Sequence, residues 1–131
     1  MGVRVANLET VALQPSDHSF CHLREKKESN VLRDSWVLIS PENSPTRTLT
    51  AGYTTVYPGC RTGGHSHEDY EEVYHITKGK GIMTVGEEEF EVSAGDTFLV
   101  PFGLYHTVRN PYQGVLEYFW VISLNHEKAQ K

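Results

Sequence analysis

Residues 59–79 read GCRTGGHSHEDYEEVYHITKG, with His65 and His67 two positions apart and a carboxylate at Glu72. In an extended strand, side chains at i and i+2 point to the same face, and their Cα atoms lie about 6.5–7 Å apart. Two imidazoles on one face can converge on one metal ion, because each metal–nitrogen bond needs only about 2.0–2.1 Å. The two glycines before the pair let the backbone bend and aim both rings inward. The stretch therefore predicts strands that carry metal ligands.

Short strand-like runs recur on both sides of this stretch, from residue 35 to residue 123. They are rich in β-branched and aromatic residues, and turn formers separate them roughly every 8–12 residues. This spacing predicts an all-β sandwich or barrel, and no segment after residue 35 has a helical period. Val3–Leu8 and Phe20–Arg24 are expected to be extended as well. The expected strands of the barrel are Trp36–Ile39, Thr48–Tyr57, Glu72–Thr77, Ile82–Val85, Glu89–Val92, Thr97–Val100, Tyr105–Arg109 and Leu116–Ser123.

Length and composition exclude several classes of protein. The chain has 131 residues, the size of one domain, and 38% of them are hydrophobic, which excludes a disordered chain. No apolar run approaches the roughly 18 residues of a membrane-spanning helix. The net charge is −5 without any block of Lys and Arg, a poor match for a nucleic acid. The first residues lack the apolar core of a signal peptide, so we expect a cytoplasmic protein that binds neither nucleic acid nor membrane.

Further candidate ligands follow the histidine pair. Glu72 enters the strand after His67, and Glu71 is its rival, because a slip of one residue exchanges the two faces. Tyr74 shares the face of Glu72. His106 comes much later, on a short strand of its own. Three imidazoles and one carboxylate form a mixed set that suits Fe, Mn, Ni, Co, Cu or Zn, and the sequence does not choose among these metals.

Two motifs in the chain resemble those of a known family. Residues 59–79 fit the pattern G-x5-H-x-H-x4-E-x6-G, and residues 95–110 fit G-x5-P-x-G-x2-H-x3-N. These patterns resemble the first and second motifs of the cupin family, with every fixed position filled. The resemblance implies a double-stranded β-helix, or jelly-roll, barrel that encloses one metal centre. The ligands that it implies are His65, His67, Glu72 and His106.

The resemblance also suggests how the chain is organised. Residues 35–125 are expected to form the cupin barrel, and residues 126–131 form a polar tail. Small cupins often pair through their N-terminal strands, so residues 1–34 are expected to be an extension that exchanges strands in a homodimer. The other four histidines, His18, His22, His75 and His126, are expected to do surface or packing work, with His75 facing away from the site.

A metal-dependent cupin enzyme that acts on a small, polar, oxygen-rich molecule is the leading functional hypothesis. The metal would polarise a carbonyl, carboxylate or enediolate. Dioxygenation is the favoured reaction class, because four protein ligands on an octahedral ion leave two positions for substrate and O2. Isomerase or lyase chemistry follows closely, with Tyr74 or Glu71 as proton carrier.

The alternative to an enzyme is a non-catalytic cupin that binds a small molecule such as a sugar or organic acid. The loop of residues 40–46 could cover the pocket of either kind of protein. Strand alternation alone does not say which of the candidate pocket residues face inward; these candidates are Trp36, Tyr53, Thr55, Tyr57, Arg61, Phe119 and Trp120.

Overall fold

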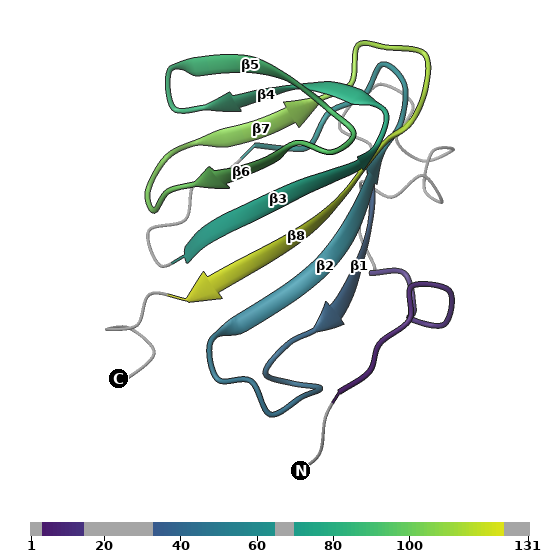
Figure 1. Cartoon of the computed structure of the whole chain (residues 1–131), viewed down its shortest axis with the longest axis vertical. Helices are drawn as coiled ribbons and strands as arrows, with labels where there is room; N and C mark the ends of the chain where they lie inside the picture. Colours follow the sequence, from purple (N-terminus) through teal and green to yellow (C-terminus); the bar gives the residue numbers. More distant parts are fainter. Residues whose placement is uncertain (1–3, 15–32, 65–69, 125–131) are drawn as a thin grey trace.

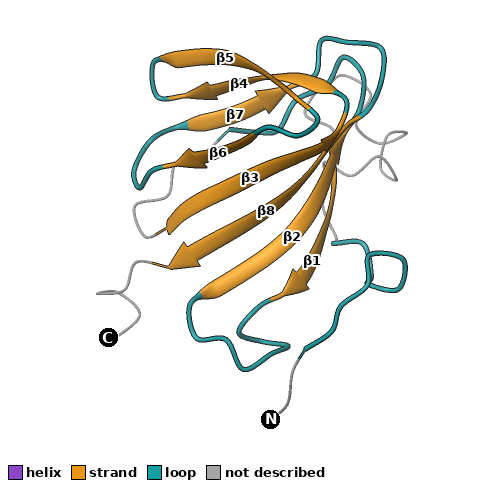
Figure 2. Cartoon of the chain, in the orientation of Figure 1, coloured by secondary structure: helices purple, strands orange, loops and turns teal. Residues whose placement is uncertain are grey.

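Antiparallel strands make up the regular structure of the protein. The computed structural model describes residues 4–14, 33–64 and 70–124 (Figure 1). Within these ranges there are eight strands and no helix (Figure 2), and so no helix of the length and apolarity that crossing a membrane requires. The strands are β1 (Arg33–Ile39), β2 (Leu49–Val56), β3 (Tyr70–Lys78), β4 (Lys80–Val85), β5 (Glu88–Ser93), β6 (Thr97–Val100), β7 (His106–Arg109) and β8 (Leu116–Leu124).

The strands form two sheets that face each other. One sheet has five strands in the order β1-β2-β8-β3-β6, and the other has three in the order β5-β4-β7. Every pairing is antiparallel. The chain crosses from one sheet to the other, so strands distant in sequence become neighbours (Figure 1). The predicted all-β jelly-roll barrel is therefore confirmed, and all eight expected barrel strands are present within a few residues.

Alternation along β3 decides which side chains face the inside. Glu72, Tyr74 and Ile76 are buried, whereas Val73 and His75 between them are exposed. The inner face of β3 continues onto β8, where Glu72 pairs with Ile122 and Tyr74 with Trp120. His75 faces away as expected, and its Nδ1 lies 2.7 Å from Thr97 Oγ1 on β6. The core between the sheets includes the fully buried Ile76, Met83, Val108 and Leu116.

Glycine makes the tight connection between the two sheets possible. Lys78 ends β3 and Lys80 begins β4, so Gly79 alone connects them. Gly79 has a φ of 83°, and a Cβ there would lie 2.1 Å from the carbonyl oxygen of Val115. Both the backbone angle and the close contact therefore require glycine at this position.

The N-terminal residues do not form the expected strand where the structure describes them. Residues 4–10 contain no strand. Asn7 instead organises a turn, since its Oδ1 accepts a hydrogen bond from Glu9 N at 2.8 Å and its carbonyl accepts one from Thr10 N at 3.0 Å. Gln14 N then donates to Ser35 O on β1 at 2.9 Å. Phe20–Arg24 lies outside the described residues, as do His18, His22 and His126.

Asn110, the last position of the second motif, holds three segments together. Its side chain is fully buried. Its Nδ2 donates to Val56 O at 3.0 Å and to Gly114 O at 2.8 Å, and its Oδ1 accepts from Tyr112 N at 3.1 Å. The residue therefore has a structural role, because it links the end of β7, the end of β2 and the loop after β7.

We expect Asn110→Ala to lower the free energy of unfolding by about 2–4 kcal/mol, because each buried group that loses its partner costs about 1–3 kcal/mol. Urea unfolding measures the loss. Asn110→Asp is the matched comparison: it keeps the acceptor for Tyr112 N but sets an oxygen against two carbonyl oxygens, so it should be at least as destabilising. Wild-type stability in both variants would contradict the structural role.

Candidate metal centre and its cavity

Two of the four expected metal ligands meet inside the barrel. Glu72 lies on β3 of the large sheet, and His106 is the first residue of β7 in the small sheet. Glu72 Oε1 and His106 Nε2 are 3.0 Å apart. Both residues are buried, with exposed fractions of 4% and 2%. The fold therefore brings a carboxylate and an imidazole together although 34 positions separate them in the sequence.

A cation between these two groups would satisfy both. His106 Nδ1 lies 3.2 Å from the carbonyl oxygen of Leu104, which can only accept a hydrogen bond. Nδ1 therefore donates to Leu104, and Nε2 is the ring nitrogen that faces the carboxylate of Glu72. Nε2 and the carboxylate contact each other directly at 3.0 Å, and they are the two atoms that would bind a metal ion at this place. This donor pair fits a divalent transition metal, which accepts imidazole and carboxylate ligands together.

The segment before the histidine pair runs alongside His106. Thr62 N donates to Val108 O at 2.8 Å, and Thr62 Oγ1 accepts from Val108 N at 3.0 Å. Gly64 follows with a φ of 74°. A Cβ on Gly64 would lie 2.1 Å from the hydroxyl oxygen of Tyr105, the neighbour of His106. His65 and His67 themselves lie outside the described residues, so their role as ligands stays a prediction.

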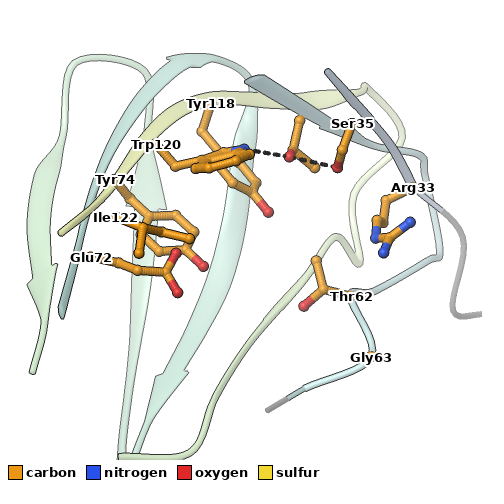
Figure 3. Close-up of a pocket in the computed structure, with 10 residues that line it drawn as sticks. Arg33, Ser35, Thr62, Gly63, Glu72, Tyr74, Tyr118, Trp120 and Ile122 are labelled. Atoms are coloured by element: carbon orange, nitrogen blue, oxygen red, sulfur yellow. Dashed lines mark hydrogen bonds between the residues drawn. The ribbon is translucent and has the colours of Figure 1, made fainter. Parts of the chain in front are cut away.

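A cavity of about 300 Å³ opens beside Glu72. Figure 3 shows the carboxylate of Glu72 and the guanidinium of Arg33 on opposite sides of it, with the hydroxyls of Tyr74, Tyr118 and Thr62 directed into the space. The cavity therefore combines an aromatic wall with polar groups that converge from several strands, as small-molecule sites commonly do. The described residues that line it are Arg33, Ser35, Thr54, Thr62, Gly63, Glu72, Tyr74, Tyr118, Trp120 and Ile122.

A chain of hydrogen bonds fixes one wall of the cavity. Trp120 Nε1 donates to Thr54 Oγ1 at 2.9 Å, and Thr54 Oγ1 lies 2.9 Å from Ser35 Oγ (Figure 3). The three residues come from β8, β2 and β1. The wall is therefore preorganised, because its polar atoms are already satisfied before any ligand enters.

Tyr74, a predicted proton carrier, is held firmly in the cavity wall. Its ring stacks on Phe98 with a centroid distance of 5.1 Å and lies 4.9 Å from the ring of Tyr118. Burial raises the pKa of Tyr74 well above its ordinary value, and the negative charge of Glu72 and a hydrogen bond with Glu72 raise it further. The phenol is therefore protonated at neutral pH, which suits a hydrogen-bond donor better than a base.

Tyr118 lies between the two charged groups of the cavity. Burial raises the pKa of its hydroxyl and the charge of Glu72 raises it further, whereas the charge of Arg33 lowers it. The sequence did not single out Arg33 or Tyr118 for the site. The available signal was strand alternation, which places Arg33 and Ser35 on one face of β1 and likewise Tyr118 and Trp120 on one face of β8. That signal becomes useful only once the inner faces are known.

The structure brings few of the other predicted site residues to this cavity. Of the seven candidate pocket residues, Trp120 lines it. Tyr53 and Phe119 pair with each other on the opposite face, where Tyr53 Oη donates to Glu117 Oε1 at 2.8 Å. Glu71 lies on the opposite face of β3 from Glu72 and is not among the described residues lining the cavity. Its role as a proton carrier has no support from this geometry and stays a prediction.

Known proteins share both the sequence pattern and the fold. A family model described as "Cupin domain" matches residues 52–122, more than half of the chain. The chain belongs to the cupin family. A solved structure of a predicted oxalate decarboxylase from Thermotoga maritima has a TM-score of 0.74 at 22% identity, covering 92% of this chain and 98% of that one. At this identity the likeness shows the cupin fold alone.

Two further relatives match part of their own length. An uncharacterized protein of Methanocaldococcus jannaschii, MJ1618, is 42% identical over 52 residues, which are 40% of this cupin and 42% of the relative. The Bacillus subtilis oxalate decarboxylase OxdC has a TM-score of 0.64 at 26% identity, covering 72% of this cupin and 26% of that chain. This cupin therefore spans less than half the length of either protein.

We expect Gly64→Ala to destabilise the protein more than Gly59→Ala, by at least about 1 kcal/mol, because the new Cβ meets Tyr105. Gly59 is the matched control, since its φ is 77° but a Cβ there would meet nothing within 4 Å. Urea unfolding gives both values. Combining Gly64→Ala with Tyr105→Ala should remove the excess cost; an equal cost in both single variants would show that the contact with Tyr105 is unimportant.

Proposed function

We propose that this cupin is a metal-dependent enzyme that acts on a small, oxygen-rich carboxylate. The observation that carries the proposal is the buried pair of Glu72 and His106, a carboxylate and an imidazole that converge to 3.0 Å, beside a cavity that also contains Arg33. A purely structural pair would not need an open cavity next to it. A protein that only binds ligands would not need a four-residue metal site.

Four residues of this chain would hold the metal. Glu72 and His106 supply two donor atoms that already converge within 3.0 Å. His65 and His67 complete the set in this proposal, and Gly63, two positions before His65, lines the cavity. Fe, Mn, Ni, Co, Cu and Zn all suit such ligands. When bound, the ion supplies a Lewis acid that polarises a carbonyl or carboxylate oxygen of the substrate.

The remaining polar groups of the cavity position the substrate. Arg33 can bind a carboxylate through two parallel hydrogen bonds, which fixes both its place and its orientation. Tyr74 and Tyr118 keep their protons, so their hydroxyls donate hydrogen bonds to substrate oxygens that gain negative charge. Trp120 and Ile122 form an apolar wall that limits the access of water to the reacting atoms.

Cleavage of a carbon–carbon bond next to a carbonyl group, as in a decarboxylase, is the reaction class that we favour. Two structural relatives are named as oxalate decarboxylases, and a carboxylate-binding arginine suits such substrates. Dioxygenation is the second candidate, because four protein ligands on a six-coordinate ion leave two positions for substrate and O2.

Assembly as a homodimer through residues 1–34 and a cytoplasmic location remain predictions from the sequence.

We expect Glu72→Gln and His106→Ala to lose the metal, each with at least about a tenfold drop in affinity, because removing even a supporting residue of a metal site typically costs about 10–100-fold. Elemental analysis of untagged protein should find about one transition metal ion per wild-type chain. Competition with a chelator gives the affinities of the variants.

Two matched variants control for general damage to the fold. Glu71→Gln and His75→Ala change the same residue types. Both residues lie on β3, on the face opposite to that of Glu72. Both should keep the wild-type metal content. Equal metal content in all four variants would overturn the proposed site.

We expect the protein to turn over at least one compound in a panel of oxalate, 2-oxo acids, 2-hydroxy acids and enediols. CO2 release and O2 uptake are measured in parallel. CO2 release without O2 uptake supports a lyase, and O2 uptake supports a dioxygenase. On the best substrate, Tyr74→Phe should lower kcat by about 100–1,000-fold, the cost of losing one transition-state hydrogen bond. Unchanged turnover would assign Tyr74 to packing. Full activity or full binding by metal-free protein would refute the metal-dependent enzyme.

A further inference from the structure

A second cavity, of about 400 Å³, lies next to the first on the inner face of the large sheet. Trp120 and Ile122 line both cavities. Thr50 on β2 pairs with Ile122 on β8, which in turn pairs with Glu72 on β3. These three side chains therefore form one row across the inner face. Two of them, Thr50 and Ile122, line the second cavity, so this cavity reaches the row that contains the proposed metal ligand Glu72.

Trp120 is the wall that the two cavities share. Its indole lies against Gly52, where a Cβ would be only 2.2 Å from Trp120 Cζ2. The hydrogen bond from Trp120 Nε1 to Thr54 Oγ1, at 2.9 Å, holds the ring in that position. Any larger residue at position 52 would push the indole up into the cavities. The absent side chain at Gly52 therefore leaves room for the indole at the place where it lines both cavities.

The chemistry of the second cavity differs from that of the first. Val37 and Pro41 contribute apolar surface, and Thr48 and Thr50 contribute hydroxyl groups. Among the described residues that line it, Arg47 is the single charged one, and no carboxylate offsets it. Pro41 belongs to the loop of residues 40–46, which the sequence predicts as a possible cover of the pocket. Such a lining suits an aliphatic chain that ends in an anionic group.

We propose that the second cavity holds the remote end of the substrate, and that the substrate class is a linear dicarboxylate. One carboxylate lies in the first cavity with Arg33, the aliphatic chain passes over Trp120, and the other carboxylate pairs with Arg47. This assignment rests on the proposed function for the first carboxylate. It goes further by requiring a negative charge at the far end and a chain longer than that of oxalate. The first cavity alone, at about 300 Å³, has the volume of about ten water molecules, so a diacid as short as oxalate would leave the second cavity to water.

Isothermal titration calorimetry with a series of saturated dicarboxylates, from malonate to suberate, tests the assignment. Each is compared with the monocarboxylate of equal chain length. In the wild type we expect one chain length at which the diacid binds about tenfold more tightly than its monoacid, because one charge-assisted pair is worth about 1.4 kcal/mol. Arg47→Gln should abolish this preference. Arg33→Gln should weaken diacids and monoacids alike.

Arg109→Gln is the matched control, since Arg109 is half-exposed on β7 and pairs with Glu89 at 3.4 Å. It should keep the preference for the diacid. Metal content is measured on the same samples and should not change in Arg47→Gln. If no sample contains metal, the proposed function is refuted, whereas the preference for one chain length is tested independently of it. The assignment is overturned if no diacid binds, if no chain length is preferred, or if Arg47→Gln retains the preference.

Discussion

The contact between Glu72 and His106 joins the two sheets at the place where the interior is polar. Each group alone would be costly to bury, because a carboxylate or an imidazole loses its water without gaining a partner. Together they are partners for each other at 3.0 Å, and the neighbouring side chains pack around this contact. Tyr74 and Tyr118 surround the carboxylate with aromatic surface, and apolar residues such as Met83 and Val108 close the core beyond it.

Strand alternation places the other groups of the site on the same face of the sheet as Glu72. Because side chains along β3 alternate, the face that carries Glu72 also carries Tyr74 and Ile76, so the metal ligand, the hydroxyl donor and the core belong to one surface. The same register on β8 places Tyr118, Trp120 and Ile122 along the first cavity, and Trp120 and Ile122 line the second cavity as well. A shift of one residue in either strand would exchange this set for Glu71, His75 and Phe119, which are the outer face.

The second motif contributes support as well as a ligand. Asn110 ties the end of β7 to β2 and to the loop after it through three hydrogen bonds. The segment of residues 59–62 pairs with the same strand, through Gly59 N to Asn110 O at 2.7 Å and Thr62 N to Val108 O at 2.8 Å. The two motifs, which are far apart in sequence, are thus hydrogen-bonded to each other. This arrangement explains why an asparagine without metal-binding chemistry is one of the fixed positions.

The sequence by itself determined the fold class, the family and the candidate ligands, since turn spacing, strand composition and motif spacing are local properties of the chain. It also set the alternation that turns Glu72 inward and His75 outward. Only the tertiary structure decided which inward-facing residues share a cavity, because that depends on the register between strands distant in sequence. Arg33, Tyr118 and Arg47 carry no motif, and six of the seven residues expected to line the pocket are absent from the described lining. The position of the Trp120 indole beside both cavities depends on Gly52 of a different strand, a packing relation that no local pattern encodes.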